Sequence, residues 1–67
     1  MTITIEVNGD EKEVADGTTA SALLDVLGLP ERGIAIAVDG AVHHRGRWNT
    51  PLADGARIDI LTAVQGG

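Results

Sequence analysis

The sequence contains no cysteine, no phenylalanine and no tyrosine, and Trp48 is its only aromatic residue. Without cysteine the chain can form no disulfide and has no thiol nucleophile, and two histidines are too few for a structural zinc site. Because a chain of 67 residues without disulfides or a zinc site has no cross-link, its stability depends on its hydrophobic core. Because aromatic residues are nearly absent, we expect a core of Ile, Leu, Val and Ala side chains.

Basic residues are also scarce. The sequence contains five Lys and Arg residues and ten Asp and Glu residues, which gives a net charge of -5. Nucleic-acid binding requires clustered cations, and Arg45 and Arg47 are the only close basic pair. We therefore expect no nucleic-acid partner. An acidic surface instead suits a protein partner with a basic docking face.

Long apolar runs are missing, because none approaches the roughly 20 residues that cross a bilayer. The first residues show neither the basic start nor the continuous apolar stretch of a signal peptide. These observations predict a single cytoplasmic domain with no membrane partner.

Motifs of enzyme sites are missing as well. The sequence has neither a phosphate-binding loop nor a dinucleotide fingerprint, and its acidic residues are scattered singly. His43 and His44 are adjacent, so on a strand they would point to opposite faces, and we interpret them as surface histidines. The chain is therefore predicted not to be an enzyme and to bind no metal or cofactor itself.

Hydrophobic periodicity predicts the order β-β-α-β-β-β. Alternating residues over 2–8 and the following Asn8-Gly9 predict a strand and a hairpin turn. The helix is expected over about 19–27, begun by a Thr18 or Thr19 cap and ended at Gly28. The other predicted segments are strands at 11–15, 34–38, 41–43 and 57–64 and an irregular stretch at 45–52.

This order predicts an α+β fold in which one helix covers one face of a sheet. The predicted core is Ile3, Ile5, Val7, Leu23, Leu24, Leu27, Ile36, Val38, Ile58 and Ile60. Trp48 is expected to close one end of this core.

The open face of the sheet is the predicted partner-binding surface. If Ile58 and Ile60 face the helix, their neighbours on the same strands must face away from it. The resulting flat apolar patch with an acidic edge suits a protein partner. Its predicted members are Asp59, Leu61 and Ala63 on the last strand and Ala35 and Ala37 on the third.

The chain ends in Gln65-Gly66-Gly67, which we predict to be a flexible tail after a domain of residues 1–64. Glycines lack the side chains that would pack, but such a tail can thread a channel too narrow for any Cβ. Fully extended, 64–67 reach roughly 13 Å. The terminal carboxylate has a reference pKa of about 3.3–3.7, so it is ionised at neutral pH and is a poor electrophile. A separate enzyme would have to activate Gly67, and acyl adenylation is the usual route.

Taken in order, several short motifs resemble the ThiS family, the sulfur carriers of thiamine biosynthesis. They are Ile5-Glu6-Val7-Asn8-Gly9, Gly17-Thr18-Thr19, Leu23-Leu24, Leu27-Gly28-Leu29, Ala35-Ile36-Ala37-Val38-Asp39-Gly40, Arg45-x-x-Trp48, Leu52-x-Asp54-Gly55 and Ala63-Val64-Gln65-Gly66-Gly67. One departure is His43-His44-Arg45, where the family commonly has Val-Pro-Arg, and the missing proline leaves the backbone of this turn open.

The resemblance implies a β-grasp (ubiquitin-like) fold, with a mixed sheet of four to five strands packed on one helix. It also implies a cycle. A ThiF-like enzyme, using ATP and Mg, adenylates Gly67; sulfur displaces AMP; and the thiocarboxylate serves a ThiG-like thiazole synthase. Gln65, Gly66 and Gly67 would thread into these enzymes, and the free carrier is expected to be a monomer.

Three alternatives remain open at this point. The chain could carry sulfur for molybdopterin or another pathway, although such carriers are usually longer. It could be a β-grasp interaction module without covalent chemistry, or a ubiquitin-like modifier that is joined to lysine.

The role of Arg45 is also open, because its side chain could bind backbone carbonyls or contact a partner.

Overall fold

A computed structural model of the chain describes residues 1–62. Its elements are β1 (Thr2–Val7), β2 (Asp10–Ala15), α1 (Ala20–Val26), β3 (Ile34–Val38), β4 (Ala41–Val42), the 3-10 turn η1 (Arg45–Arg47) and β5 (Arg57–Thr62). The predicted order of strands and helix is confirmed, and the irregular stretch contains η1. Residues 63 and 64 of the predicted last strand and the predicted tail, 65–67, lie outside the described residues.

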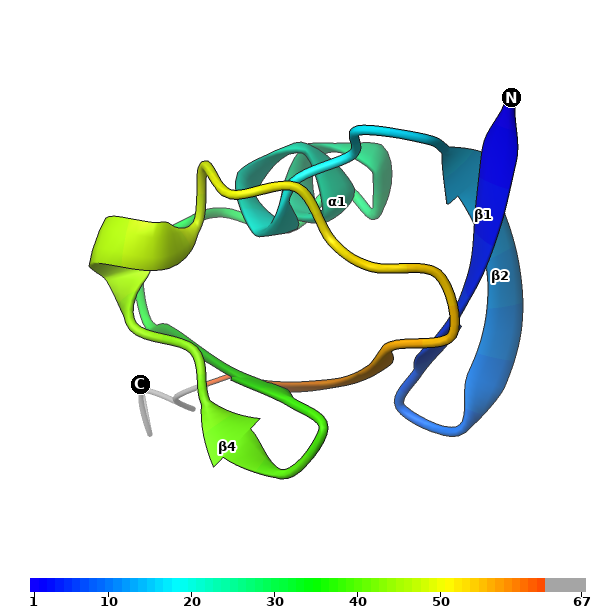
Figure 1. The fold of residues 1–67 in the computed structure, drawn as a ribbon. Helices are drawn as coiled ribbons and strands as arrows, with labels where there is room; N and C mark the ends of the chain where they lie inside the picture. Colours follow the sequence, from blue (N-terminus) through cyan, green and yellow to red (C-terminus); the bar gives the residue numbers. More distant parts are fainter. Residues whose placement is uncertain (63–67) are drawn as a thin grey trace.

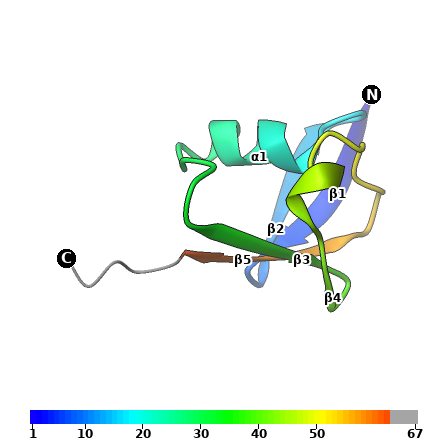
Figure 2. The same ribbon diagram turned by 90° about the vertical axis from the view of Figure 1, so that its left-hand side faces the viewer.

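The five strands form one mixed sheet in the order β2-β1-β5-β3-β4. The central strand β5 runs parallel to β1 and antiparallel to β3, and the two outer pairs are antiparallel. Helix α1 lies on one side of this sheet, and the other side is left open (Figures 1 and 2). The structure therefore has the predicted β-grasp arrangement, with the last strand in the middle of the sheet.

The hairpin between β1 and β2 turns at Asn8 and Gly9. Asn8 has a φ of 51° and Gly9 a φ of 90°, so both occupy the left-handed region that the sequence Asn-Gly favours. Asp39 and Gly40 make the same kind of turn between β3 and β4, with φ values of 53° and 85°. The predicted Asn8-Gly9 turn is confirmed, and Asp39-Gly40 repeats its geometry.

Helix α1 has the predicted caps. The hydroxyl of Thr19 accepts a hydrogen bond from the N–H of Ala22 at 3.1 Å. At the other end Gly28 has a φ of 74°, and the N–H of Leu29 donates to the carbonyl of Leu24 at 2.9 Å. The chain thus leaves the helix through a glycine in the left-handed conformation, and Leu29 returns to pack against the core.

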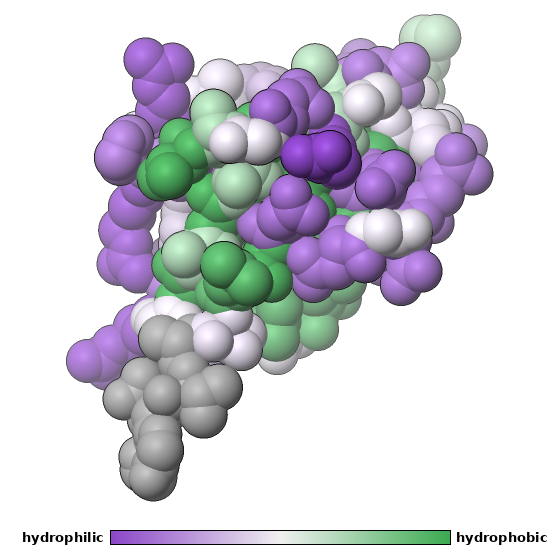
Figure 3. Space-filling view, turned by 90° about the horizontal axis from the view of Figure 1, so that it is seen from below, coloured by the Kyte–Doolittle hydropathy of each residue, from purple (hydrophilic) through white to green (hydrophobic). Residues whose placement is uncertain are grey.

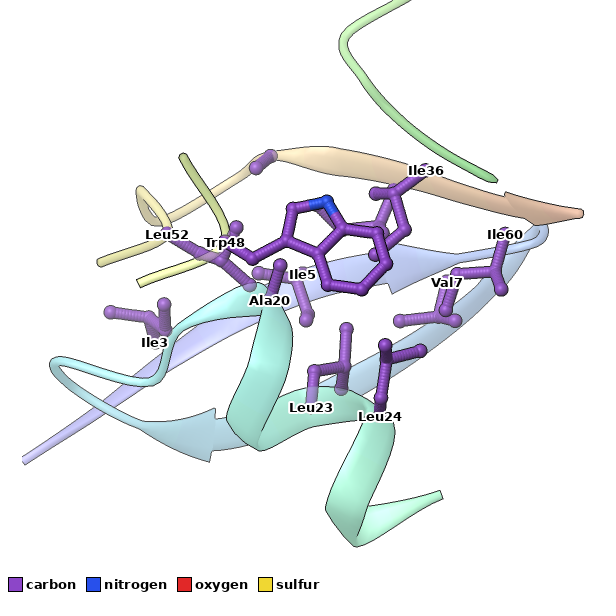
Figure 4. Packing of buried hydrophobic residues seen from close by; sticks show 12 residues of the cluster. Ile3, Ile5, Val7, Ala20, Leu23, Leu24, Ile36, Trp48, Leu52 and Ile60 are labelled. Atoms are coloured by element: carbon purple, nitrogen blue, oxygen red, sulfur yellow. The ribbon is translucent and has the colours of Figure 1, made fainter. Parts of the chain in front are cut away.

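The core lies between α1 and the sheet. Leu23 and Leu24 of the helix point toward Ile5 and Val7 of β1 (Figure 4), and neither leucine is exposed. Eight of the ten predicted core residues are buried: Ile3, Ile5, Val7, Leu23, Leu24, Ile36, Ile58 and Ile60.

Two core predictions were wrong in degree. Leu27 and Val38 are only partly buried, because Leu27 caps the end of the helix and Val38 is the last residue of β3. Three buried residues were absent from the prediction: Ala20, Leu52 and Ala56.

The two histidines follow β4 instead of lying on it. His44 is exposed as predicted, but His43 is partly buried, and its ring Nε2 is buried without a hydrogen-bond partner among residues 1–62. His43 was therefore wrongly predicted to be a surface residue. His44 has φ -63° and ψ 149°, the conformation that a proline would adopt. Histidine in place of the family's proline therefore leaves the backbone of this turn unchanged.

Candidate functional site

Strand β5 leads into the tail and is fixed along its length. Each of its residues from Ile58 to Thr62 pairs with a residue of β3. Its last described residue, Thr62, pairs with Ile34 at the start of β3. In Figure 2 this end of β5 points away from the β1–β2 hairpin. The domain therefore provides a rigid base from which residues 63–67 continue.

Two residues in the turns that follow the neighbouring strands β1 and β3 form hydrogen bonds with the backbone of β5. The side chain of Asn8 accepts a hydrogen bond from the N–H of Ile60 at 2.7 Å, and the side chain of Asp39 accepts one from the N–H of Arg57 at 2.9 Å. The carbonyl of Arg57 in turn accepts a bond from the N–H of Asp39 at 2.8 Å. Side chains of the Asn-Gly and Asp-Gly turns thus complete the pairing of the central strand.

The open face of the sheet carries an apolar patch, which we call the open-face patch. Residues directly opposite on neighbouring strands share a face, and the two pairs concerned are Ala35 with Leu61 and Ala37 with Val42. Leu61 is 70% exposed and Val42 71%. Figure 3 shows hydrophobic residues (green) gathered on the left and lower part of this side of the molecule, with hydrophilic residues beside them.

The structure brings together most of the predicted partner-binding residues. Asp59, Leu61, Ala35 and Ala37 lie on the open face as predicted, and Ala63 lies outside the described residues. Their role in docking stays a prediction. Val42 was not among the predicted residues, because only the pairing of β4 with β3 shows which of the two β4 residues shares a face with Ala37.

A shallow hollow adjoins this patch at the end of β5. It has a volume of about 310 Å³ and is lined by Gly33, Ile34, Ala35, Leu61 and Thr62. Because Thr62 is the last described residue, the hollow marks the surface around the root of the tail.

The other part of the open face is polar. Arg57 and Asp59 form an ion pair, with 3.6 Å between Nε and Oδ2, but both side chains are about half exposed, so the pair adds little stability. On the hairpin, Glu6 lies opposite Glu11. The apolar patch therefore has the acidic edge that the sequence predicted.

Trp48 and Arg45 form a structural pair at the turn η1. Trp48 is 4% exposed, and its indole N–H donates to the carbonyl of His43 at 2.9 Å. The guanidinium of Arg45 lies 5.1 Å from the centre of the Trp48 ring and donates to the carbonyl of Glu31. Trp48 thus closes the core as predicted, and Arg45 binds a backbone carbonyl, one of the two roles left open.

No group of His, Asp and Glu side chains within residues 1–62 could hold a metal ion. Among the same residues, no helix is long and apolar enough to span a bilayer. The predicted tail residues Gln65, Gly66 and Gly67 are outside the described part of the chain. The structure therefore shows where β5 ends at Thr62, but not the positions of these three residues.

Comparison with known proteins adds to this geometry. A model of the ThiS family matches residues 3–67. Among solved structures, the chain is similar to a thiamine biosynthesis protein (ThiS) from Geobacter metallireducens, with a TM-score of 0.79 and 25% sequence identity. The alignment covers 97% of this chain and 100% of that one. A search of curated proteins gave no significant match.

Proposed function

The chain belongs to the ThiS family of small sulfur carriers in thiamine biosynthesis, and we propose that the carboxyl group of Gly67 is the group that carries the sulfur. The observation that carries this proposal is the extent of the family match, which runs to residue 67 and includes both terminal glycines. The fold supports it, because the central strand β5 leads directly toward these residues.

The proposed chemistry has two steps at the carboxyl group of Gly67. A carboxylate oxygen of Gly67 attacks the α-phosphorus of ATP and releases pyrophosphate, which forms an acyl adenylate. A hydrosulfide equivalent then attacks the carbonyl carbon and displaces AMP, which leaves a thiocarboxylate. Adenylation is needed because the free carboxylate is ionised and resists nucleophilic attack.

Other proteins supply the catalysis in this scheme. A protein of the ThiS family is a carrier and not itself a catalyst. We propose that a ThiF-like enzyme binds ATP and Mg and adenylates Gly67, and that a ThiG-like thiazole synthase takes the sulfur. We also propose that the free carrier is a cytoplasmic monomer.

The open-face patch is the proposed docking surface for these enzymes. Leu61 and Val42 are large, apolar and exposed, and the alanines beside them leave the surface flat. Apolar patches with a polar rim are typical of protein interfaces. Because Leu61 is adjacent to Thr62, an enzyme bound here would hold the tail by its root.

Intact mass spectrometry tests the proposal. The chain is incubated with a ThiF-like enzyme, ATP, Mg and a sulfur donor. We expect a mass gain equal to the replacement of one oxygen by sulfur, located on Gly67 by fragmentation. Omission of ATP is the control and should prevent the gain. Modification at any other residue would contradict the proposal.

The sulfur acceptor distinguishes the remaining pathways. The thiocarboxylated chain should support thiazole formation by thiazole synthase and should not support molybdopterin formation. The reverse result would assign the carrier to molybdopterin. An isopeptide bond to lysine in place of sulfur transfer would indicate a protein modifier.

A further inference from the structure

Charge is unevenly distributed along the chain. Residues 1–16, which include the β1–β2 hairpin, carry five of the ten carboxylates and a single cation, Lys12. Residues 31–47 carry three of the five cations, both histidines and two carboxylates, Glu31 and Asp39. The hairpin of β1 and β2 and the turn η1 lie on opposite sides of the molecule (Figure 1). The protein is acidic overall, but it has a basic end.

Three arginines form this basic end. Arg45 donates to the carbonyl of Glu31, the residue before Arg32, and Arg47 belongs to the same 3-10 turn as Arg45. All three arginines are exposed. Arg45 is engaged with Glu31 and with the Trp48 ring, whereas the side chains of Arg32 and Arg47 make no hydrogen bond or ion pair within residues 1–62.

The basic end lies beside the root of the tail. Arg32 precedes Gly33, which lines the hollow together with Thr62, and Ile34 pairs with Thr62. The five residues that follow Thr62 span at most roughly 17 Å when fully extended. An enzyme that encloses Gly67 in a deep site must therefore bring the mouth of its channel against the surface around Thr62, where Arg32 lies.

We propose that Arg32, supported by Arg47, orients the chain on the activating enzyme by facing carboxylates at the mouth of the channel that receives the tail. This inference rests on the proposed function, because it takes that enzyme as the partner. Charges at the rim of an interface act chiefly on the rate and orientation of encounter. The same acidic mouth repels the carboxylate-rich hairpin, so the wrong end of the chain is turned away.

Association kinetics test the proposal with charge reversals at the two ends. Stopped-flow binding of the whole chain to the ThiF-like enzyme is measured without ATP over a range of NaCl concentrations. Arg32→Glu should slow association about three- to tenfold at low salt and flatten its dependence on salt. Arg47→Glu should act in the same direction but less strongly. Lys12→Glu makes the same charge change on the hairpin and should stay within about twofold of the native rate.

Several outcomes would overturn the proposal. They are an unchanged rate for Arg32→Glu, an equal loss for Lys12→Glu, and no binding of the native chain to the enzyme. Thermal melts of the three variants establish that each is folded before its rate is compared. A chain that binds with the expected Arg32 dependence but is never adenylated contradicts the proposed function alone, because no chemistry occurs in the binding measurement.

Discussion

The side-chain oxygen of Asn8 accepts a hydrogen bond from the backbone N–H of Ile60 at 2.7 Å, across 52 positions of sequence. The N–H of Asn8 also donates to the carbonyl of Ile58 at 2.9 Å. One residue of the first turn therefore holds two residues of the strand that leads to the tail. Its φ of 51° allows it to end β1 and face β5 at the same time.

Asn8→Ala should lower the free energy of unfolding by about 1–3 kcal/mol, because the N–H of Ile60 loses its partner in a partly buried place. Chemical denaturation measures the change, and hydrogen exchange at Ile60 should become faster. Asn8→Asp keeps an acceptor oxygen at the same position and is the control. Equal losses for Ala and Asp would show that the hydrogen bond is not the cause.

Leu24→Ala should cost about 2–5 kcal/mol, because it opens a cavity under the helix where Leu24 has no exposed surface. This is a large share of the stability of a domain of this size. Val26→Ala is the control on the same helix, since Val26 is 73% exposed, and its effect should stay within about 0.5 kcal/mol. Urea unfolding compares the two, and similar losses would contradict the assigned helix face.

Periodicity predicted this fold well where strands and helix repeat regularly. Ile3, Ile5 and Val7 alternate and are all buried, and Thr19 and Gly28 bound the helix as predicted. Periodicity failed beyond these elements. Leu52 and Ala56 are buried by the path of an irregular segment, which no repeat in the sequence reveals.

The candidate site was predicted only in part, because periodicity covers some of its residues and not others. Alternation alone placed Leu61 on the open face, because Ile58 and Ile60 had to face the helix. To place Val42 on the open face, by contrast, one needs the register of β4 against β3, and β4 has only two residues. The burial of His43 depends on how the chain returns from β4 to Trp48, a tertiary contact with no local signal.

His44→Pro should stabilise the protein by about 0.4–1 kcal/mol, because proline restricts the unfolded chain and suits a residue at φ -63°. The N–H of His44 makes no backbone hydrogen bond within residues 1–62, so none is lost. His43→Pro is the opposite case, since its N–H donates to the carbonyl of Ile36 at 2.8 Å. Thermal melts should show a rise for the first variant and a fall for the second.

Leu61→Glu should weaken binding to the activating enzyme by at least about tenfold, since it places a charge on the open-face patch beside the root of the tail. The fold should survive, because Leu61 is 70% exposed. Val26→Glu is matched to it: an equally exposed apolar residue, but on the helix at the other side of the sheet. Titration calorimetry measures both affinities. Equal weakening would assign docking to overall charge and not to this face.

Deletion of Gly67 should abolish thiocarboxylate formation and leave folding unchanged. The new terminus would stop about 3.3 Å short of the adenylation site, and reacting atoms must approach more closely than such an error allows. The core lies within residues 3–60, so the melting temperature should not change. Intact mass after incubation with enzyme, ATP and sulfur donor gives the first result, and a thermal melt gives the second.

Gly66→Val tests the same tail without shortening it. A branched side chain one residue before the terminus should block a channel shaped for glycine, so the gain of sulfur should be lost although the carboxylate of Gly67 is present. Thr2→Val, at an exposed position of the first strand, serves as the control and should be modified normally. If the chain without Gly67 still supported thiazole formation, the carboxylate could not be the sulfur site. The fold would then be better explained as a β-grasp interaction module, whose binding through Leu61 needs no terminal glycine.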